Sequence, residues 1–515
     1  MTAGSDRSNG DLERLFQAVE ERQWDTVTEG LRSMWGELYD NRPAELLALF
    51  SAMPEEEFDK APRLRIAQEH LRNKVEGKPF SRAYRDILGS DEAADPIDRL
   101  AALTGQLAVA RANGRHFESV RIAETAREYL RSLPIDAIPK LSNALPEFHF
   151  HWGVTFEQAG RTEEAVDEYI ESFDWATSIG SRMTMTSAAG ALAYLRALAG
   201  QDREAAAWLE KIPAPPSEGW WSAFATTKAL LADALIKVDR LDRAGARAVL
   251  DTIDIAQSVD DVGEYYFVSA LVTSSSSDAQ QLLAGMDQLL GDLPRGEMRS
   301  PATSEYLSVA RYLLLTELGR TAGALRMMES EQLTADAPLI RQIAVGLHVR
   351  RLIAVGNHAA GRRLSDPLKH VANSRPRVLV RALLVSAETD KLGRYPELLE
   401  RAVELAHYNR HYSAFRMVLP QTRLDAAALF HELGDTEVSM RLKAASEPVV
   451  MPGADSLTRR ERRVVELALR GLSNPQIAEH LAVSVNTVKT QMRSAYGKLR
   501  VSSREQLMQQ LQFEE

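Results

Sequence analysis

Residues 484–499 read SVNTVKTQMRSAYGKL, and their spacing decides how the C-terminal end of this chain folds. Four apolar residues recur at helical spacing and share one face of the predicted helix: Val488, Met492, Ala495 and Leu499. Four polar residues fall on the opposite face: Asn486, Lys489, Thr490 and Arg493. The stretch therefore predicts a helix that packs on one side and offers long hydrogen-bond donors on the other.

Further helix signals surround this stretch and predict a compact four-helix domain over residues 456–515. They are the capping box Thr458-Arg459-Arg460-Glu461, a second box Ser473-Asn474-Pro475-Gln476, the N-cap Ser484, and the run Ser503-Arg504-Glu505-Gln506. Gly471 lies where the first of these helices is expected to end. The apolar face of the third helix is expected to pack on Val464, Leu467, Ala468, Ile477, Ala478 and Leu481.

A short turn followed by a helix with outward donors is typical of a helix-turn-helix, which places such side chains in the major groove of DNA. There Lys and Arg read guanine edges, and Asn reads adenine. The charge distribution agrees. From Asp455 onward the chain has ten basic against seven acidic residues, whereas the preceding residues have 52 against 65. A basic module of net +3 on an acidic body of −13 favours phosphate binding at one end only.

The segment resembles the C-terminal domain of LuxR/FixJ-type bacterial transcription regulators, over about an eighth of the chain. The matching residues are Leu457, Thr458, Arg460, Glu461, Val464, Leu467, Gly471, Ser473, Asn474, Ile477, Ala478, Leu481, Val483, Ser484, Thr487, Val488, Lys489, Lys498, Leu499, Val501 and Arg504. Two positions depart from the family pattern or weaken the helix. Gln491 stands where His is frequent, and Gly497 loosens the end of the helix by up to about 1 kcal/mol relative to Ala.

The resemblance implies roles for individual residues. Base contacts are expected from Lys489, Thr490, Arg493 and Asn486, and backbone contacts from Ser484, Thr487, Gln491 and Lys498. Leu507, Met508 and Leu511 align with the helix that pairs subunits in many members. The implied partners are double-stranded promoter DNA, a second copy of the chain in a homodimer, and RNA polymerase.

The remainder of the chain shows a recurring helical unit. Its turns lie at Gly114-Arg115, Gly160-Arg161, Gly200-Gln201, Asp239-Arg240, Gly319-Arg320, Gly356-Asn357, Gly393-Arg394 and Gly434-Asp435. Successive turns are 37 to 46 residues apart, except for the 80 residues between Asp239 and Gly319, and Ala165, Ala205 and Ala324 follow three of the glycines by five residues. A glycine lets the chain reverse, and a small alanine lets the second helix approach the first. Such hairpins must stack on their neighbours to bury their apolar faces.

The expected fold is all-α, a TPR-like helical-hairpin solenoid followed by the four-helix module. Trp152-Gly153 before Gly160, with Tyr169 after it, resembles a tetratricopeptide repeat, although the spacing exceeds the usual ~34 residues. An irregular all-α domain without true repeats is the alternative. The expected organisation is a flexible tail at 1–12, a sensor or interaction domain at 13–445, a hinge at 446–455 and the DNA-binding domain at 456–515.

Several classes of site are not expected. The chain has no cysteine, which excludes disulfides and thiolate metal sites. It contains neither a phosphate-binding P-loop nor a hydrolase or metalloprotease motif, so we expect no enzyme, no cofactor and no ATPase module of the MalT-like kind. The pairs His149/His151 and His407/His411 lack a third ligand, so no metal site is expected. No apolar run reaches the ~18 residues of a membrane span, and no signal segment is visible, so we expect a cytoplasmic protein without membrane contact.

Trp220, Trp221 and Phe224 form an aromatic cluster with two interpretations: core of the solenoid, or the lining of a ligand groove. The expected function is a transcription regulator whose helical body senses a peptide or small-molecule effector and controls the C-terminal helix-turn-helix. The acidic body is further hypothesised to cover the basic helix until the effector binds. The alternative is a TPR-like scaffold or peptide-binding protein with an accessory DNA tether.

Overall fold

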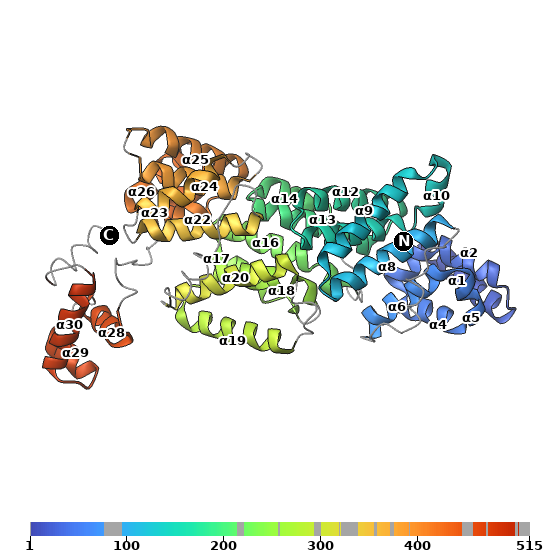
Figure 1. Ribbon diagram of the computed structural model, residues 1–515, viewed down its shortest axis with the longest axis horizontal. Coiled ribbons are helices and arrows are strands. Elements are labelled where there is room, and N and C mark those ends of the chain that lie inside the picture. Colours follow the sequence, from blue (N-terminus) through green and yellow to red (C-terminus); the bar gives the residue numbers. More distant parts are fainter. Residues whose placement is uncertain are drawn as a thin grey trace.

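The computed structural model describes residues 2–76, 95–213, 221–255, 258–292, 300–318, 320, 338–354, 358–370, 375–390, 392–444, 457–469, 472–499 and 503. Every regular element among these residues is a helix, which confirms the predicted all-α class. The helices follow one another along an elongated stack, with α1–α6 at one end and α28–α30 at the other (Figure 1). None of the described helices is long and apolar enough to cross a bilayer.

The N-terminal helices form a small bundle with its own apolar core. They are α1 (Thr2–Glu20), α2 (Trp24–Ser33), α3 (Trp35–Asn41), α4 (Pro43–Ala52), α5 (Glu55–Lys60) and α6 (Pro62–Glu76). Leu31, Leu46, Phe50 and Leu71 are buried in this core. α1 begins at Thr2 and Leu12 is buried in the same core, so a helix lies where a flexible tail at residues 1–12 was expected.

The central part is a stack of helical hairpins around the largest core. Its elements are α8 (Pro96–Ala112), α9 (His116–Ser132), η1 (Ile135–Ala137), α10 (Ile138–Leu141), α11 (Leu145–Gln158), α12 (Thr162–Ile179), α13 (Arg182–Ala199), α14 (Asp202–Glu210), α15 (Ser222–Ala225), α16 (Thr227–Asp239), α17 (Arg243–Leu250), η3 (Val259–Asp261), α18 (Val262–Val272), α19 (Ser276–Asp292), α20 (Pro301–Glu317) and α22 (Leu339–Ala354). One continuous core runs from Ile66 to Val385. This continuity is expected of hairpins that bury their apolar faces against their neighbours.

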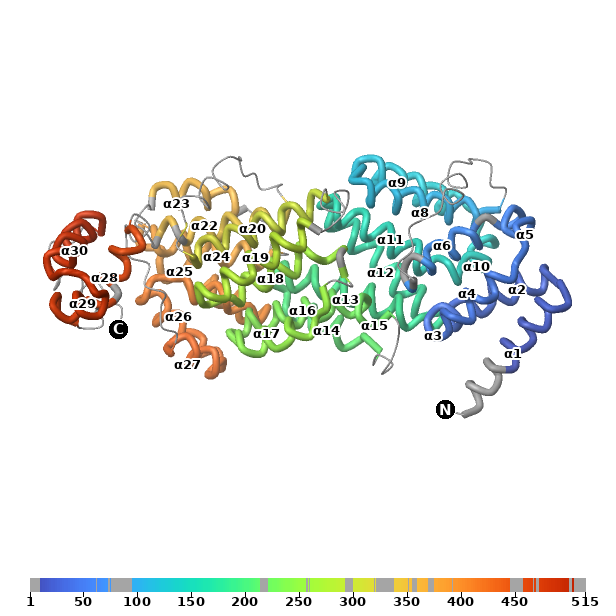
Figure 2. The backbone as a smooth tube through the Cα atoms, turned by 90° about the horizontal axis from the view of Figure 1, so that it is seen from below, coloured from blue at the N-terminus to red at the C-terminus, as the bar shows by residue number. Residues whose placement is uncertain are grey.

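The stack ends in a further bundle with a separate core. Its elements are α23 (His358–Ser365), η5 (Asp366–His370), α24 (Pro376–Glu388), α25 (Tyr395–Asn409), η6 (Ser413–Met417), α26 (Pro420–Glu432) and α27 (Thr436–Ala444). Phe415 and Phe430 meet edge to face at the centre of this core. Figures 1 and 2 show the module formed by α28–α30 at the same end of the molecule as this bundle.

The structure confirms most of the predicted hairpin turns. Gly114, Gly160, Gly200, Gly393 and Gly434 all have positive φ and lie between successive helices. At Gly200, φ is +84°, and an added Cβ would lie 2.7 Å from the backbone nitrogen of Arg377, so this turn requires glycine for two reasons. The turn at Asp239-Arg240 is also present, with Leu241 at positive φ. Gly319 and Gly356 lie outside the described residues.

Small residues let the paired helices approach, as the sequence predicts. Ala165 and Ala205 are fully buried. A Cβ on Gly153 would lie 2.6 Å from the ring of Tyr169, so the Trp152-Gly153 pair makes room for that tyrosine. Helical stacking is thus confirmed, whereas the likeness to tetratricopeptide repeats stays a prediction.

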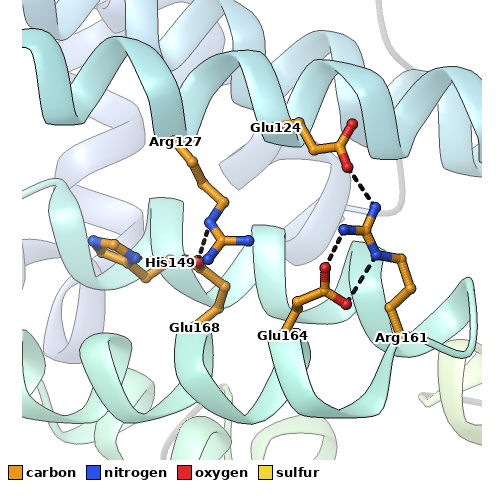
Figure 3. A network of polar contacts seen from close by, with 6 residues as sticks. All are labelled: Glu124, Arg127, His149, Arg161, Glu164 and Glu168. Carbon is orange, nitrogen blue, oxygen red and sulfur yellow. Dashed lines mark hydrogen bonds and ion pairs between the residues drawn. The ribbon is translucent and has the colours of Figure 1, made fainter.

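Charged side chains cross-link the hairpins α8–α9 and α11–α12. Glu168 of α12 lies 2.7 Å from both Arg127 Nε of α9 and His149 Nδ1 of α11 (Figure 3). Arg161, just before α12, donates to Glu124 of α9 at 2.5 Å and also pairs with Glu164. These contacts set the position of neighbouring helices, and they give His149 a partner within the fold.

Candidate nucleic-acid interface

The C-terminal module is built from α28 (Arg459–Leu469), α29 (Asn474–His480) and α30 (Val485–Leu499). Both predicted capping boxes are present. The backbone nitrogen of Thr458 donates to Glu461 Oε2 at 2.6 Å, and that of Ser473 donates to Gln476 Oε1 at 2.8 Å. The Thr487 nitrogen donates to Ser484 Oγ at 3.0 Å, which confirms the N-cap of α30. Gly471 and the run 504–506 lie outside the described residues.

The core of the module follows the predicted pattern. The four residues expected on the inner face of α30 are all buried: Val488, Met492, Ala495 and Leu499. They pack on Val464, Leu467, Ala468, Ile477 and Ala478, with Leu481 partly buried beside them. Because this core draws every buried member from residues 457–499, α28–α30 form a hydrophobic unit separate from the body.

The outer face of α30 is exposed along its length. Asn486, Lys489, Thr490 and Arg493 are all exposed, as are Ser484 and Thr487 near the start of the helix. Lys489 and Arg493 make no hydrogen bond or ion pair with any described residue. The Thr490 hydroxyl donates to the Asn486 carbonyl at 2.9 Å, which leaves its oxygen able to accept. Two cations one helical turn apart are therefore available to a ligand outside the chain.

The turn before α30 has the length of a helix-turn-helix connection. Residues 481–484 separate α29 from α30, and Ala482 adopts a left-handed conformation with φ +53°. The Val483 nitrogen donates to the Ala478 carbonyl at 3.0 Å, so this turn is held against the end of α29. In such a motif the second helix is the one that enters the major groove. In this module that helix is α30.

Lys498, for which a DNA-backbone contact stays a prediction, forms an ion pair within the module. Its Nζ lies 2.7 and 2.9 Å from the two carboxylate oxygens of Glu461, and its side chain is 33% exposed. Ser494 Oγ donates to the same carboxylate at 2.6 Å. Lys498 thus ties α30 to α28, a role that sequence reasoning missed. The signal was available, because Ser494 and Lys498 are four residues apart and share one helix face.

The same cluster sets the ionisation of Glu461. Removal from water favours the neutral acid, but hydrogen bonds from Lys498, Ser494 and Thr458 outweigh it and lower the pKa of Glu461 to about 2. The carboxylate therefore stays charged at neutral pH.

Gln491, which was expected to contact the DNA backbone, is half-buried, which leaves only part of it available to DNA.

Two other predicted sets have different outcomes. Leu507, Met508 and Leu511, expected to pair subunits, lie outside the described residues, as does Trp220. Trp221 is only 1% exposed, packs with Met183 and Ala225, and donates its indole N–H to the Asp40 carbonyl at 2.9 Å. Phe224 packs against this cluster. The structure therefore favours the core interpretation of Trp221 over the ligand groove.

His407 and His411 each contact an acid in the fold. His407 Nδ1 lies 2.7 Å from Asp435, and His411 Nδ1 lies 2.9 Å from Asp239. The two therefore point to different partners and do not converge on one site.

Comparison with known proteins finds the same module. Residues 455–511 match the family described as bacterial regulatory proteins, luxR family. An HTH-type transcriptional regulator encoded in the exeN 3′ region of Aeromonas salmonicida is 47% identical over 70 residues, which make up 13% of this chain and 36% of that protein. The HTH-type transcriptional regulators MalT of Serratia proteamaculans and Yersinia pestis are 48% and 46% identical over 56 residues.

These likenesses cover one end of the molecule. The 56 residues shared with each MalT make up 11% of this chain and 6% of the relative, so the chain spans only a small part of those relatives. No solved structure matches this chain. The comparisons and the geometry of α28–α30 agree that residues 455–511 carry a LuxR-family helix-turn-helix domain.

Proposed function

We propose that this chain, whose residues 455–511 form a LuxR-family helix-turn-helix domain, is a transcription regulator that binds promoter DNA in a sequence-specific way. One observation carries the proposal. Lys489 and Arg493 project from the exposed side of the second helix of the motif, whose other side is buried. Long cationic donors at this place read base edges in the major groove.

The residue roles belong to the same proposal. Asn486, Lys489, Thr490 and Arg493 contact base edges, whereas Ser484, Thr487 and Gln491 contact the DNA backbone. Lys498 supports α30 through Glu461 and contributes less to DNA directly. A homodimer, paired through Leu507, Met508 and Leu511, binds two half-sites about 10–10.5 bp apart or a multiple of that distance.

The test is to select binding sites from genomic fragments with the full-length chain and then titrate Lys489→Ala and Arg493→Ala on the selected site. Each variant should lose about 1–3 kcal/mol of binding free energy and relax specificity at one base position. Lys443→Ala is the control, because Lys443 is an exposed lysine of α27 outside the module. Unchanged affinity in both module variants would remove these residues from the interface. Absence of any discrete footprint would favour the scaffold with a DNA tether.

The body is the sensing part of the proposed regulator. An effector that changes DNA binding must bind two states of the protein with different affinity. The acidic body, at about −13, can cover the basic face of α30 and release it when the effector binds. A fragment comprising residues 456–515 should then bind DNA more tightly than the full chain at equal salt. Weaker binding by the fragment, even after artificial dimerisation, would contradict masking.

A further inference from the structure

A cavity of about 140 Å³ lies where the N-terminal bundle meets the first hairpins of the stack. Its lining comes from α2, α3, α6, α8 and α11, together with α10 and the residues that follow it. Figure 2 shows α2, α6, α8 and α11 gathered at this end of the molecule. A dry cavity of about 150 Å³ holds one benzene ring, so this one suits a small organic molecule. Ligand cavities often form at such junctions between packed units.

One side of the cavity combines aromatic rings with an acid, and we call Trp35, Tyr39, Phe148 and Glu147 the aromatic–acidic corner. The rings of Trp35 and Tyr39 are stacked, with centroids 5.3 Å apart. The Trp35 indole N–H donates to the Glu147 carboxylate. Glu147 is half-buried and lines the cavity, so part of its surface is available to a molecule inside.

The acid of this corner is not neutralised by an ion pair. Glu147 forms none within the described residues, and the charged group that acts on it is a second acid, Asp40. The two arginines in the lining form ion pairs with other acids. Arg63 donates to both carboxylate oxygens of Asp98 at 3.0 Å, and Arg32 donates to Glu29 at 2.6 Å. Lys140 is exposed to solvent.

The environment of Glu147 is costly for an isolated negative charge. Burial and the neighbouring Asp40 raise the pKa of Glu147 to about 7, although the Trp35 hydrogen bond acts in the opposite direction. Burial, followed by the charges of Glu147 and Asp40, likewise raises the pKa of Tyr39. A positive charge placed in this corner would relieve the repulsion, and the aromatic faces would stabilise it further by cation–π attraction.

We propose that the cavity binds a small organic cation, an amine or quaternary ammonium group attached to an apolar body about the size of one benzene ring. The ammonium group pairs with Glu147 beside the Trp35 and Tyr39 rings, and the apolar body lies against Leu31 and Ile66. The regulatory role of this ligand rests on the proposed function. The proposal that it binds rests on the cavity and its lining alone.

The corner is joined to the main stack through Asp40. The Met183 nitrogen at the start of α13 donates to Asp40 Oδ2 at 3.2 Å, and Ser181 Oγ lies 3.4 Å from both carboxylate oxygens. Trp221 donates to the carbonyl of the same residue. A cation beside Glu147 therefore changes the electrostatic surroundings of a residue that caps α13, which gives the ligand a physical route to the central helices.

The test uses the full-length chain and three ligands of matched shape: benzylamine, benzyl alcohol and benzoate. Isothermal titration should show benzylamine binding at least about tenfold more tightly than the other two. Tighter binding of benzoate would mean that the arginines and Lys140 govern the cavity, and this result would overturn the proposal. Equal affinities, or no binding of any ligand at millimolar concentration, would overturn it as well.

Two variants locate the site. Glu147→Gln keeps the shape of the side chain and removes its charge, so benzylamine should bind at least about tenfold more weakly while benzyl alcohol binds as before. Glu171→Gln, which removes an exposed acid of α12, should leave all three affinities unchanged. Retained benzyl alcohol binding shows that the Glu147 variant is folded. Unchanged benzylamine affinity in this variant, or loss of both ligands together, would count against the pairing.

A DNA-binding titration with and without benzylamine separates this proposal from the proposed function. If the amine selectivity and its loss in Glu147→Gln are observed while DNA affinity does not change, the cavity is a ligand site without a regulatory link. If the chain binds no DNA at all, the proposed function fails and the amine site stands.

Discussion

The helix-turn-helix module and the helical body place their charged residues in opposite ways. In the module, Lys489 and Arg493 are exposed and have no partner among the described residues. In the body, Arg377 is 1% exposed and donates to Asp239 and to the Ala197 and Leu198 carbonyls. Exposed cations are available to a partner, whereas buried ones hold elements of the fold together. The exposed cations of the module are therefore placed for binding, whereas the buried cation of the body serves the fold.

The buried cluster around Asp239 shows what the interior charges do. Asp239 ends α16, and it accepts from Arg377 of α24 and from Ser413 Oγ at 2.6 Å. Its backbone carbonyl accepts from the Tyr412 nitrogen at 2.9 Å. Although burial favours the neutral acid, Arg377 and His411 lower the pKa of Asp239. Three segments that are distant in sequence thus meet at Asp239, which joins the central stack to the last bundle.

The largest expected effect comes from breaking this cluster. Arg377→Met should lower the free energy of unfolding by about 3–5 kcal/mol, because Asp239 and two backbone carbonyls lose their donor while remaining buried. All seven tryptophans lie before residue 222, so urea denaturation followed by tryptophan fluorescence reports on the body alone.

Arg115→Met is the matched control for this prediction. Arg115 forms a surface pair with Glu118 at 2.9 Å, and exposed pairs contribute only about 0–1 kcal/mol. A loss of less than about 1 kcal/mol in Arg377→Met would show that the buried cluster is not what joins the two bundles.

In the module, the next largest effect is expected at Glu461. Glu461→Gln should destabilise a fragment of residues 456–515 by about 2 kcal/mol, because the capping box and the Lys498 bond both lose a charged acceptor. This loss of stability should depend on pH. Hydrogen bonding lowers the pKa of Glu461 to about 2, against about 4.3 for an unfolded glutamate.

The sign of this pH dependence follows from the lowered pKa. The contribution of Glu461 is complete above about pH 4.3 and is lost as the pH falls toward 2. Thermal unfolding of the fragment, followed by circular dichroism between pH 2 and 6, measures it. Wild type and Glu461→Gln should converge at the acid end, and parallel curves over this range would contradict the assignment.

The two regions also differ in how much the sequence reveals. The module was predictable almost residue by residue, since caps, helical spacing and outward donors are local signals within one short stretch. What the spacing did not specify was the partner of Lys498, since its contact with Glu461 depends on how α28 and α30 cross. In the body, turns such as Gly160 and Gly200 were predictable because reversal of the chain demands them.

Contacts between distant segments were not predictable. Glu147 and Trp35 are separated by more than a hundred residues, and no local pattern indicates that they meet in one cavity. Trp221 illustrates the converse, because an aromatic cluster in the sequence suited a groove and a core equally well. The buried Trp221 donates a hydrogen bond to the carbonyl of Asp40, which belongs to the N-terminal bundle, far away in the sequence.

A smaller effect, opposite in sign to that of Glu461, is expected from the buried acids around Lys228. Its Nζ lies 2.7 Å from Glu157, 2.9 Å from Glu264 and 3.4 Å from Asp261. One cation cannot neutralise three acids. Burial, opposed by Lys228 and reinforced by the other acids, raises the pKa of Asp261 to about 7.

The folded body therefore holds a proton on Asp261 that the unfolded chain releases near pH 4. Its free energy of unfolding should fall as the pH rises from about 4 through about 7. Asp261→Asn should flatten this fall and stabilise the body above pH 7, by on the order of 1 kcal/mol. Tryptophan-detected urea titrations at pH 5 and pH 8 measure the difference. An equal change in stability at both pH values would rule out the buried proton.

The smallest expected effect tests the turn that presents α30. Ala482 has φ +53°, a conformation that costs an L-residue roughly 1–2 kcal/mol and glycine much less. Since glycine also loses more freedom on folding, Ala482→Gly should stabilise the module by about 0.5–1 kcal/mol. Ala478→Gly, inside α29, is the opposite control and should destabilise it by about 1 kcal/mol or more. Both are measured by thermal unfolding of the fragment of residues 456–515. A destabilising Ala482→Gly would mean that the turn does not hold the left-handed conformation in solution, and that α30 is presented to DNA by a different connection.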